Sequence, residues 1–537
     1  MTCKDCPGEQ LPFEQTKLAW GVIRTPGKLF SLLLLVLTSA SSLLAIESET
    51  IGLTAMRRER PAITGAGIAV AQPEGIGPEA ADAWESPQFV NFSVAFTWTS
   101  DLGMSTNYPN TVGSFSAHAF NVGLNFYGVF GEDVGVAPGI PTVDNYDAGY
   151  YLNAIIINQQ PTRARVINQS FIINSVPSTT VDPLYDDYAA MYNVLFVSGM
   201  NNIPDQPYAP GTAYNGLGVG LIWPGQQSSV GPTSDGRCKP DLVAPHFCCS
   251  SFSTPQVAGG AALLLQAGTA NDGGSNTASI ATNSSVVKAL LINGAVKTTN
   301  WTNGVTRPLD ARYGAGVLNV YHSDRQLRGG RRPASDTNSV TIGAAHLPTA
   351  KTNNVASLRG WDFSNLQSPV LKDGVAHYYF NLPTNDGPHS VTTTLVWKKN
   401  TGPLANLDLF LYDTRSNTLV LSSTSSVDNV EHLFIPKLAA GRYDLQVLKR
   451  GAAAPSSENY ALAFDFSPVT LAVARSETNA VVSWPASPAG FLLQAAPSLT
   501  IPITWQTLTN GSILSNGMST VTLPTSEAMR FFRLFRP

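Results

Sequence analysis

The stretch from Gly231 to Gln266 constrains the fold more than any other part of the chain. From Phe252 onward its residues are small and apolar, a composition that lets a helix pack closely inside a core rather than on a surface. Ser250 and Ser251 stand just ahead of this helix, where unpaired backbone N–H groups and the positive end of the helix dipole stabilise negative charge. The pair therefore has two interpretations, as a helix cap, which serine favours, or as a nucleophile.

Two upstream segments supply an acid and a base. The segment from Thr64 to Gly77 alternates glycine with small and β-branched residues, as a buried parallel strand ending in a glycine turn would, and it carries Glu74 near its end. Asp101 is a second candidate acid. His118 precedes apolar residues at helical spacing and then a glycine-rich turn. Either group also has a structural interpretation, because an acid at a loop mouth can cap a helix and a lone histidine is more often structural than catalytic.

Further strands and helices fill the region up to Leu327. The runs Val166–Ile173 and Val194–Asn202 indicate buried strands, the second ending in two asparagines. Strands alternate with helical patterns from Thr64 to about Leu327, which predicts a parallel sheet wrapped by helices. Catalytic groups would then lie at the carboxyl ends of the strands.

The order of these segments resembles one family. KPDLVAP followed by SSFSTPQVAGGAALLL resembles the serine motif of subtilisin-like serine proteases (subtilases, peptidase S8 family), and the acid, histidine and asparagine segments resemble that family's other motifs in the same order. The resemblance implies a subtilisin-like fold and a catalytic triad in which Ser251 is the nucleophile, His118 the general base and Glu74 the orienting acid. It also implies an oxyanion donor at Asn201, with the neighbouring Asn202 as the alternative.

Several residues depart from the family pattern. Glu74 stands where aspartate is usual and Cys249 where glycine is usual, and the bulky residues Phe171–Ile173 replace frequent glycines of the substrate-lining strand. The connection from Pro245 to Ser250 is also much shorter than in most subtilases. Two hypotheses therefore stand: a secreted serine endopeptidase that works through an acyl-enzyme, and a catalytically degenerate subtilase-fold surface or binding protein.

A third class, the serine esterases of the α/β-hydrolase kind, fits poorly. Such enzymes have a G-x-S-x-G elbow and the order serine, acid, histidine. Here the order is acid, histidine, serine.

The N-terminal region predicts export. Lys17, Arg24 and Lys28 precede the apolar run LFSLLLLVLTSASSLLA, which reads as a secretory signal peptide over residues 1–45, with cleavage after Ala40 or Ala45. We therefore expect a secreted protein, extracellular or in the cell envelope. Only 13% of the residues are charged and the net charge is −4, so nothing favours binding to nucleic acid. The resemblance to subtilases implies a protein or peptide substrate.

The chain divides into several predicted units. Its 537 residues exceed what one core can organise. After the signal peptide we expect a linker at 46–60, a catalytic domain at 61–330 and a second linker at 331–345. Short runs rich in β-branched and aromatic residues then predict two all-β sandwich or jelly-roll domains, at 346–467 and 468–537, the last suited to attachment at a cell surface.

Cysteines and acids give little sign of a metal. Cys3 and Cys6 fall in the signal region, and the three remaining cysteines, Cys238, Cys248 and Cys249, are an odd number, so at least one thiol would not form an intramolecular disulfide. No cofactor is indicated with certainty. Asp408 and Asp413 are candidates for a structural Ca²⁺, with solvated turn carboxylates as the favoured interpretation.

Overall fold

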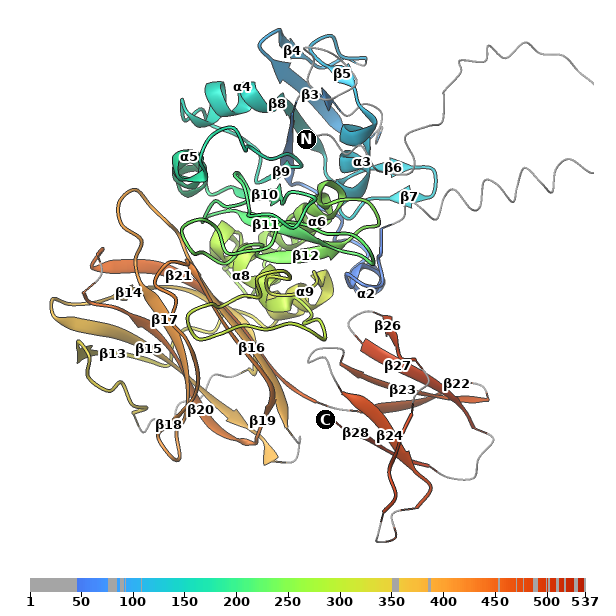
Figure 1. The fold of residues 1–537 in the computed structure, drawn as a ribbon, viewed down its shortest axis with the longest axis vertical. Coiled ribbons are helices and arrows are strands. Elements are labelled where there is room, and N and C mark those ends of the chain that lie inside the picture. The colour runs from blue at the N-terminus through green and yellow to red at the C-terminus, as the bar shows by residue number, and fades with distance from the viewer. Residues whose placement is uncertain are drawn as a thin grey trace, which may run out of the picture.

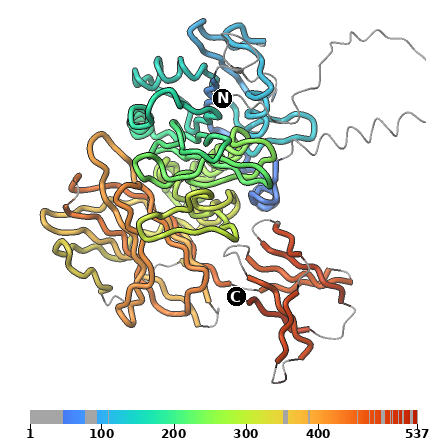
Figure 2. The backbone as a smooth tube through the Cα atoms, in the orientation of Figure 1, coloured from blue at the N-terminus to red at the C-terminus, as the bar shows by residue number. Residues whose placement is uncertain are grey.

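We describe the protein from a computed structural model, shown as a ribbon in Figure 1 and as a tube in Figure 2. The structure describes residues 46–75, 85–86, 91, 93–107, 109–349, 357–384, 388–452, 454–469, 471–476, 478–485, 491–498, 500, 503–508, 511–515, 518–525 and 530–535. The predicted signal peptide lies outside these residues. Within them, no helix has both the length and the apolar character needed to cross a membrane.

An eight-stranded sheet organises the first half of the chain (Figure 1). Its order is β12 (Leu242–Pro245), β11 (Leu217–Ile222), β10 (Leu195–Gly199), β9 (Val166–Gln169), β1 (Ala69–Glu74), β8 (Thr142–Asp147), β3 (Ala95–Ser100) and β4 (Gly103–Ser105). All neighbouring pairs are parallel except β3 and β4. The predicted parallel sheet flanked by helices is therefore confirmed.

Helix α6 (Ser250–Thr269) is the central helix of this domain. It contacts β9, β10, β11 and β12 and also α3 (Ala117–Phe126), and most of its residues are buried. Two adjacent glycines allow this close packing: a Cβ at Gly259 would lie 2.5 Å from the Val136 Cβ, and one at Gly260 would lie 2.9 Å from Val320 Cγ1.

The other helices surround the sheet and α6. They are α2 (Leu53–Glu59), α4 (Ala148–Tyr150), the π-helix η2 (Tyr151–Ile156), α5 (Ser178–Tyr192), α7 (Ala278–Ala281), α8 (Ser284–Gly294) and α9 (Val320–Arg328). This domain also contains two short pairs of strands. They are β2 (Glu85–Ser86) with β5 (Ser114–Phe115), and β6 (Val129–Phe130) with β7 (Asp133–Val134).

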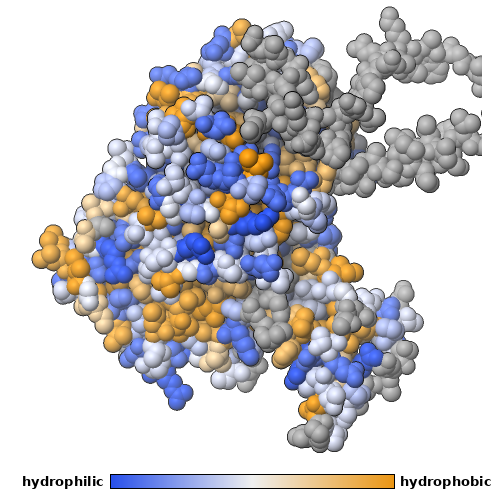
Figure 3. All heavy atoms as spheres, in the orientation of Figure 1, coloured by the Kyte–Doolittle hydropathy of each residue, from blue (hydrophilic) through white to orange (hydrophobic). Residues whose placement is uncertain are grey.

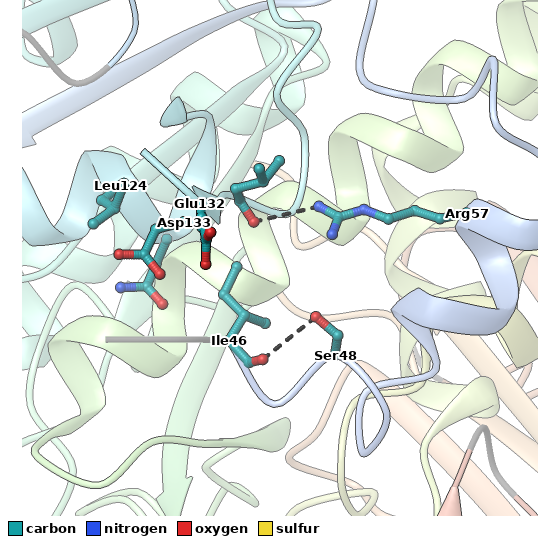
Figure 4. Close-up of a pocket in the computed structure, with 8 residues that line it drawn as sticks. Ile46, Ser48, Arg57, Leu124, Glu132 and Asp133 are labelled. Atoms are coloured by element: carbon teal, nitrogen blue, oxygen red, sulfur yellow. Dashed lines mark hydrogen bonds between the residues drawn. The ribbon is translucent and has the colours of Figure 1, made fainter. Parts of the chain in front are cut away.

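Residues 46–60, expected as a linker, pack against the domain. Ile51, Leu53 and Met56 are fully buried in the same apolar core as the sheet and α6. The Arg57 guanidinium donates to the backbone carbonyls of Val134 and Gly135, the second at 2.6 Å. Figure 4 shows the pocket at this junction, with Arg57 on one side and Glu132 and Asp133 on the other.

A β-sandwich follows the α/β domain. One sheet has the order β13 (Asp336–Thr341), β15 (Lys372–Leu382), β20 (Gly441–Lys449), β17 (Leu407–Asp413) and β18 (Thr418–Ser423). The other has the order β14 (Arg359–Gln367), β21 (Ser457–Pro468), β16 (His389–Trp397) and β19 (Val430–Leu438). Strand β13 lies within the segment expected as a second linker, so the sandwich begins earlier than the composition suggested.

The sandwich and the α/β domain share a core. The second sheet contributes Trp361, Val396, Val430, Ala461 and Ala463 to the apolar cluster that contains α6 and α8. The Trp361 indole donates to the carbonyl of Leu327 at the end of α9, at 3.1 Å. The sandwich also exposes apolar residues on the face shown in Figure 3.

The last part of the chain forms two smaller antiparallel sheets. They are β22 (Ala472–Ser476), β23 (Asn479–Pro485), β27 (Met518–Pro524) and β26 (Ile513–Ser515), and β25 (Gln506–Thr507), β24 (Leu492–Ala496) and β28 (Phe531–Phe535). Their core is separate and small, with Trp484 and Leu493 among its buried residues. Two all-β units thus follow the α/β domain, as predicted.

Candidate active site

Glu74 is the last residue of β1, at the carboxyl end of the sheet where functional groups were expected. Its side chain is completely buried, and one carboxylate oxygen, Oε2, lies 3.7 Å from His118 Nδ1. The other oxygen, Oε1, accepts a hydrogen bond of 2.8 Å from Gln72 Nε2. The structure therefore brings together the acid and the histidine that the sequence singled out.

His118 lies in the first turn of α3. Ser116 caps this helix, because its hydroxyl accepts a hydrogen bond of 3.2 Å from the Ala119 N–H. The His118 side chain is 30% exposed, whereas Glu74 is not exposed at all. The imidazole thus has a buried carboxylate on one side and reaches solvent on the other, as a group that exchanges protons with a substrate requires.

Ser251 is the second residue of α6, and its backbone carbonyl has an unusual partner. Pro255 follows four residues later and has no N–H to donate to that carbonyl. The Ser170 hydroxyl donates to it instead, at 2.8 Å. Because Ser170 directly follows β9, this bond ties the nucleophile candidate to the predicted substrate-lining strand.

Ser250 has a different environment from Ser251. It is 1% exposed, and its hydroxyl donates to the Met200 carbonyl and to Asn202 Oδ1. Cys249 is the residue at the N-cap position of α6, and it makes no side-chain capping bond. The more exposed Ser251 is therefore the better placed of the two serines for chemistry.

The two asparagines after β10 have separate partners. The Asn201 amide donates to Asp205 Oδ2 at 2.8 Å, which orients the group that was expected to hold an oxyanion towards Asp205. Asn202 instead faces α6, because its Oδ1 accepts the Ser250 N–H at 2.9 Å. Of the two candidates, Asn202 is the one in contact with the start of α6.

Aromatic rings surround the first turn of α6. The Phe252 ring lies 5.6 Å from the His118 ring and 4.9 Å from the His246 ring, and Phe247 stacks on His246 at 4.7 Å. The backbone N–H of Cys248 donates to His246 Nδ1 at 3.1 Å. Burial lowers the pKa of His246 to about 4, so this imidazole stays neutral near pH 7.

Four residues with contacts in this region were missed by sequence reasoning: Gln72, Tyr127, Ser170 and His246. Gln72 had a detectable signal, because it precedes Glu74 by two positions and residues two apart in a strand share a face. His246 begins the short connection after β12 and could have been found as a histidine close to the serine motif. Tyr127 and Ser170 gave no comparable signal.

The other site expectations have different outcomes. Asp101 is an exposed residue in the turn between β3 and β4, whereas Glu74 is the acid beside His118. Asp408 is not solvated as expected, because its side chain is buried. Burial raises the pKa of this carboxyl to about 6. Arg450 Nε donates a hydrogen bond to it at 2.6 Å, so the positive group beside Asp408 is a guanidinium. Asp413 accepts the Arg415 N–H at 2.7 Å in a turn.

Among the described residues, no three His, Cys, Asp or Glu side chains come together as a metal site. Within the same residues, no disulfide joins Cys238, Cys248 or Cys249.

The fold and these contacts define a class: an α/β domain with acid, histidine and serine presented near the carboxyl ends of its central strands. Residues 106–316 match the model of the subtilase family, Peptidase_S8, so the chain carries a domain of this family of serine proteases. The matched range includes His118 and Ser251 and begins after Glu74.

Solved structures similar to the chain include three proteases. Fervidolysin from Fervidobacterium pennivorans, a keratinolytic enzyme related to subtilisin, is 13% identical, with 92% of this chain and 81% of that chain covered and a TM-score of 0.36. A lanthipeptide protease is 15% identical over 53% of this chain and 95% of its own, with a TM-score of 0.36. Tripeptidyl peptidase 2 is 12% identical over 72% of this chain, with a TM-score of 0.30, and the chain covers only 43% of its length.

None of the curated protein sequences is significantly similar to this chain.

Proposed function

We propose that the protein is a secreted serine endopeptidase that uses Ser251, His118 and Glu74 as its catalytic triad. The observation that carries this proposal is the contact of 3.7 Å between the buried Glu74 carboxylate and His118 Nδ1, on elements that are far apart in the sequence. The ring of Phe252, the residue after Ser251, lies 5.6 Å from the His118 ring, so the first turn of α6 comes close to this pair. The subtilase match supports the same assignment for the histidine and the serine.

The chemistry follows from these roles. Ser251 Oγ attacks the scissile carbonyl carbon and forms a C–O bond while its proton passes to His118 Nε2. His118 then returns the proton to the leaving amine as the C–N bond breaks, and water hydrolyses the acyl-enzyme with His118 again as base. The Glu74 carboxylate stabilises the imidazolium and fixes the tautomer with its proton on Nδ1.

For the oxyanion we propose Asn202 together with the backbone N–H of Ser251. Asn202 Oδ1 accepts the Ser250 N–H, which anchors the side chain beside the nucleophile and leaves its NH₂ group available to a substrate oxygen. The Asn201 amide is engaged by Asp205 instead.

Export rests on the sequence of residues 1–45 alone, where a basic flank and an apolar run precede small residues. Attachment at a cell surface through residues 468–537 is likewise proposed from the small all-β unit at the end of the chain.

A second candidate function is that of a catalytically degenerate binding protein. It is favoured by the short connection at 246–249, in which Phe247 stacks on His246 and the His246 ring meets Phe252 of the first turn of α6 edge-on. Such packing narrows the space available to an extended substrate.

Hydrolysis of an unfolded protein substrate distinguishes the two functions. We expect wild-type protein to cleave reduced casein at internal bonds, whereas Ser251→Ala and His118→Ala lose nearly all activity and His346→Ala, changed on the β-sandwich, keeps it. Mass spectrometry of early fragments separates internal cleavage from stepwise removal of N-terminal residues. Absence of cleavage by wild-type protein, or equal cleavage by Ser251→Ala, favours the binding protein.

A further inference from the structure

Both the NH₂ group and the carbonyl oxygen of the Gln72 side chain make hydrogen bonds in one buried network. Its Nε2 donates to Glu74 Oε1 at 2.8 Å and to the Ala119 carbonyl at 3.0 Å, and its Oε1 accepts the Tyr127 hydroxyl at 2.5 Å. Gln72 is fully buried. A flipped amide would turn its carbonyl oxygen towards two acceptors and its NH₂ away from both, so the network permits a single amide orientation.

This network holds the acid and the base in a fixed relation. Gln72 is on the strand that carries Glu74, while Ala119 is the residue after His118 on α3. The same NH₂ group therefore connects the strand of the acid to the helix of the base. A glutamate has one more rotatable bond than an aspartate, and a donor on Oε1 restricts that extra freedom while Oε2 faces His118.

The same donor bears on the charge of Glu74. The carboxylate is completely buried, and burial alone disfavours its ionised form. A hydrogen bond donated to the carboxylate favours ionisation, and an ionised carboxylate favours the protonated form of the neighbouring imidazole. The negative charge also acts on Tyr127, whose pKa is raised well above its usual range by burial and by Glu74.

We propose that Gln72 is the positioning residue of the acid–base pair, held in its own orientation by Tyr127. It acts through Glu74 and touches no substrate. Its kinetic consequence rests on the proposed protease function, but its effect on His118 does not.

An apolar side chain would be the simpler choice if Gln72 only filled space. Its neighbours in β1, Val70 and Ala71, are apolar and fully buried. Burying an amide among such residues costs free energy unless every polar atom finds a partner. The partners here are the acid, the helix of the base and Tyr127, which is the pattern expected for a positioning role.

The test measures the pKa of His118 by NMR titration of its ring in the full chain, beside steady-state kinetics. In Gln72→Leu we expect the pKa of His118 to fall by about one pH unit relative to wild type, because the carboxylate is less ionised and less well oriented. We expect kcat to fall about tenfold or more, with KM within about twofold. The isosteric Gln72→Glu should also lose kcat near neutral pH, because it sets a second carboxylate against Glu74.

Tyr127→Phe provides a second, milder variant if Gln72→Leu does not fold. It removes only the hydroxyl that holds Gln72, so the pKa of His118 should fall by less than in Gln72→Leu. Tyr188→Phe is the matched control, since this buried tyrosine donates to the Gln160 carbonyl away from the network, and it should leave both readouts unchanged.

The inference is overturned by a pKa of His118 equal to wild type in folded Gln72→Leu or, where that variant does not fold, in Tyr127→Phe. A loss of activity that reflects only fewer folded molecules, with kcat per folded molecule unchanged, does the same. If wild-type protein has no peptidase activity, the proposed function fails, and the titration of His118 still decides the role of Gln72.

Discussion

At the scale of single residues, the hydrogen bonds that each polar side chain makes within the protein distinguish the candidate catalytic residues from their neighbours. Ser250 and Ser251 are neighbours, yet the hydroxyl of the first is committed to Met200 and Asn202. In the same way, Asn201 is engaged by Asp205 while Asn202 contacts the start of α6. Such differences between adjacent residues assign the candidate roles in this site.

The oxyanion assignment leads to a paired prediction. Asn202→Ala should lower kcat by about 10²- to 10³-fold, the usual effect of losing one oxyanion donor. Asn201→Ala should have a much smaller effect on kcat and should mainly lower stability, by about 1 kcal/mol, through the lost bond to Asp205. Steady-state kinetics and thermal unfolding of both variants check this, and a larger kcat loss in Asn201→Ala would contradict it.

The sequence revealed only part of the site. Glu74, His118 and Ser251 stand out because each lies in a local pattern of strand, helix or small residues. Ser170 could not be found in this way, since its bond to the Ser251 carbonyl joins residues 81 positions apart. Asn202 and Asn201 could not be separated either, because only the fold determines which of two adjacent side chains faces α6.

At the scale of elements, the sequence of α6 contains two features that position Ser251, its small residues and Pro255. Its small residues let it lie close to the sheet and to α3, and Gly259 in particular faces Val136. Pro255 leaves the Ser251 carbonyl to Ser170 rather than to a helical N–H. The helix thus fixes Ser251 both by its packing and by this hydrogen bond.

The packing of α6 can be tested with one methyl group. Gly259→Ala places a Cβ 2.5 Å from the Val136 Cβ, closer than two carbons can pack, so we expect a loss of stability of about 1–3 kcal/mol from overpacking. Gly304→Ala is the control, because nothing lies within 4 Å of the added methyl there, and it should change stability little. Chemical denaturation of both variants measures the difference, and equal stabilities would contradict the account of α6.

At the scale of the whole molecule, two segments expected as linkers take part in packed structure. Residues 46–60 and 331–345 lack clear apolar periodicity, yet the first contributes Leu53 and Met56 to the main core and the second contains β13. A few buried side chains in a short segment do not produce a periodic pattern. The parallel sheet was predictable, because strand-like segments alternate with helical patterns along this part of the chain.

The shared core predicts that the β-sandwich is required for folding of the α/β domain. A variant ending at Gly330 lacks Trp361 and the other sandwich residues of the main cluster, so we expect it to be unfolded or aggregated. A variant ending at Pro468 loses only the separate core around Trp484 and should keep the thermal midpoint of the main transition. Calorimetry and circular dichroism distinguish the two, and a stably folded variant ending at Gly330 would contradict the prediction.

The contact between the two units also predicts a pH dependence of stability. Lys297 is buried, donates to the Ala315 carbonyl and lies 5.5 Å from the Phe434 ring of β19. Burial lowers its pKa to about 7 from the ordinary 10.5, so the unfolded chain binds more protons between these values and stability should rise with pH across that range. Thermal midpoints should show this rise to be smaller in Lys297→Met, and an equal rise in both proteins would count against it.

The most direct test of the central claim is labelling with a fluorophosphonate, which modifies a serine only when a neighbouring base activates it. Peptide mapping by mass spectrometry should find the adduct on Ser251 of the wild-type protein, with fluoride displaced by Oγ. Labelling should be absent in Ser251→Ala and strongly slowed in His118→Ala. A wild-type protein without an adduct on Ser251, or one labelled equally fast in His118→Ala, would contradict the proposed catalytic site.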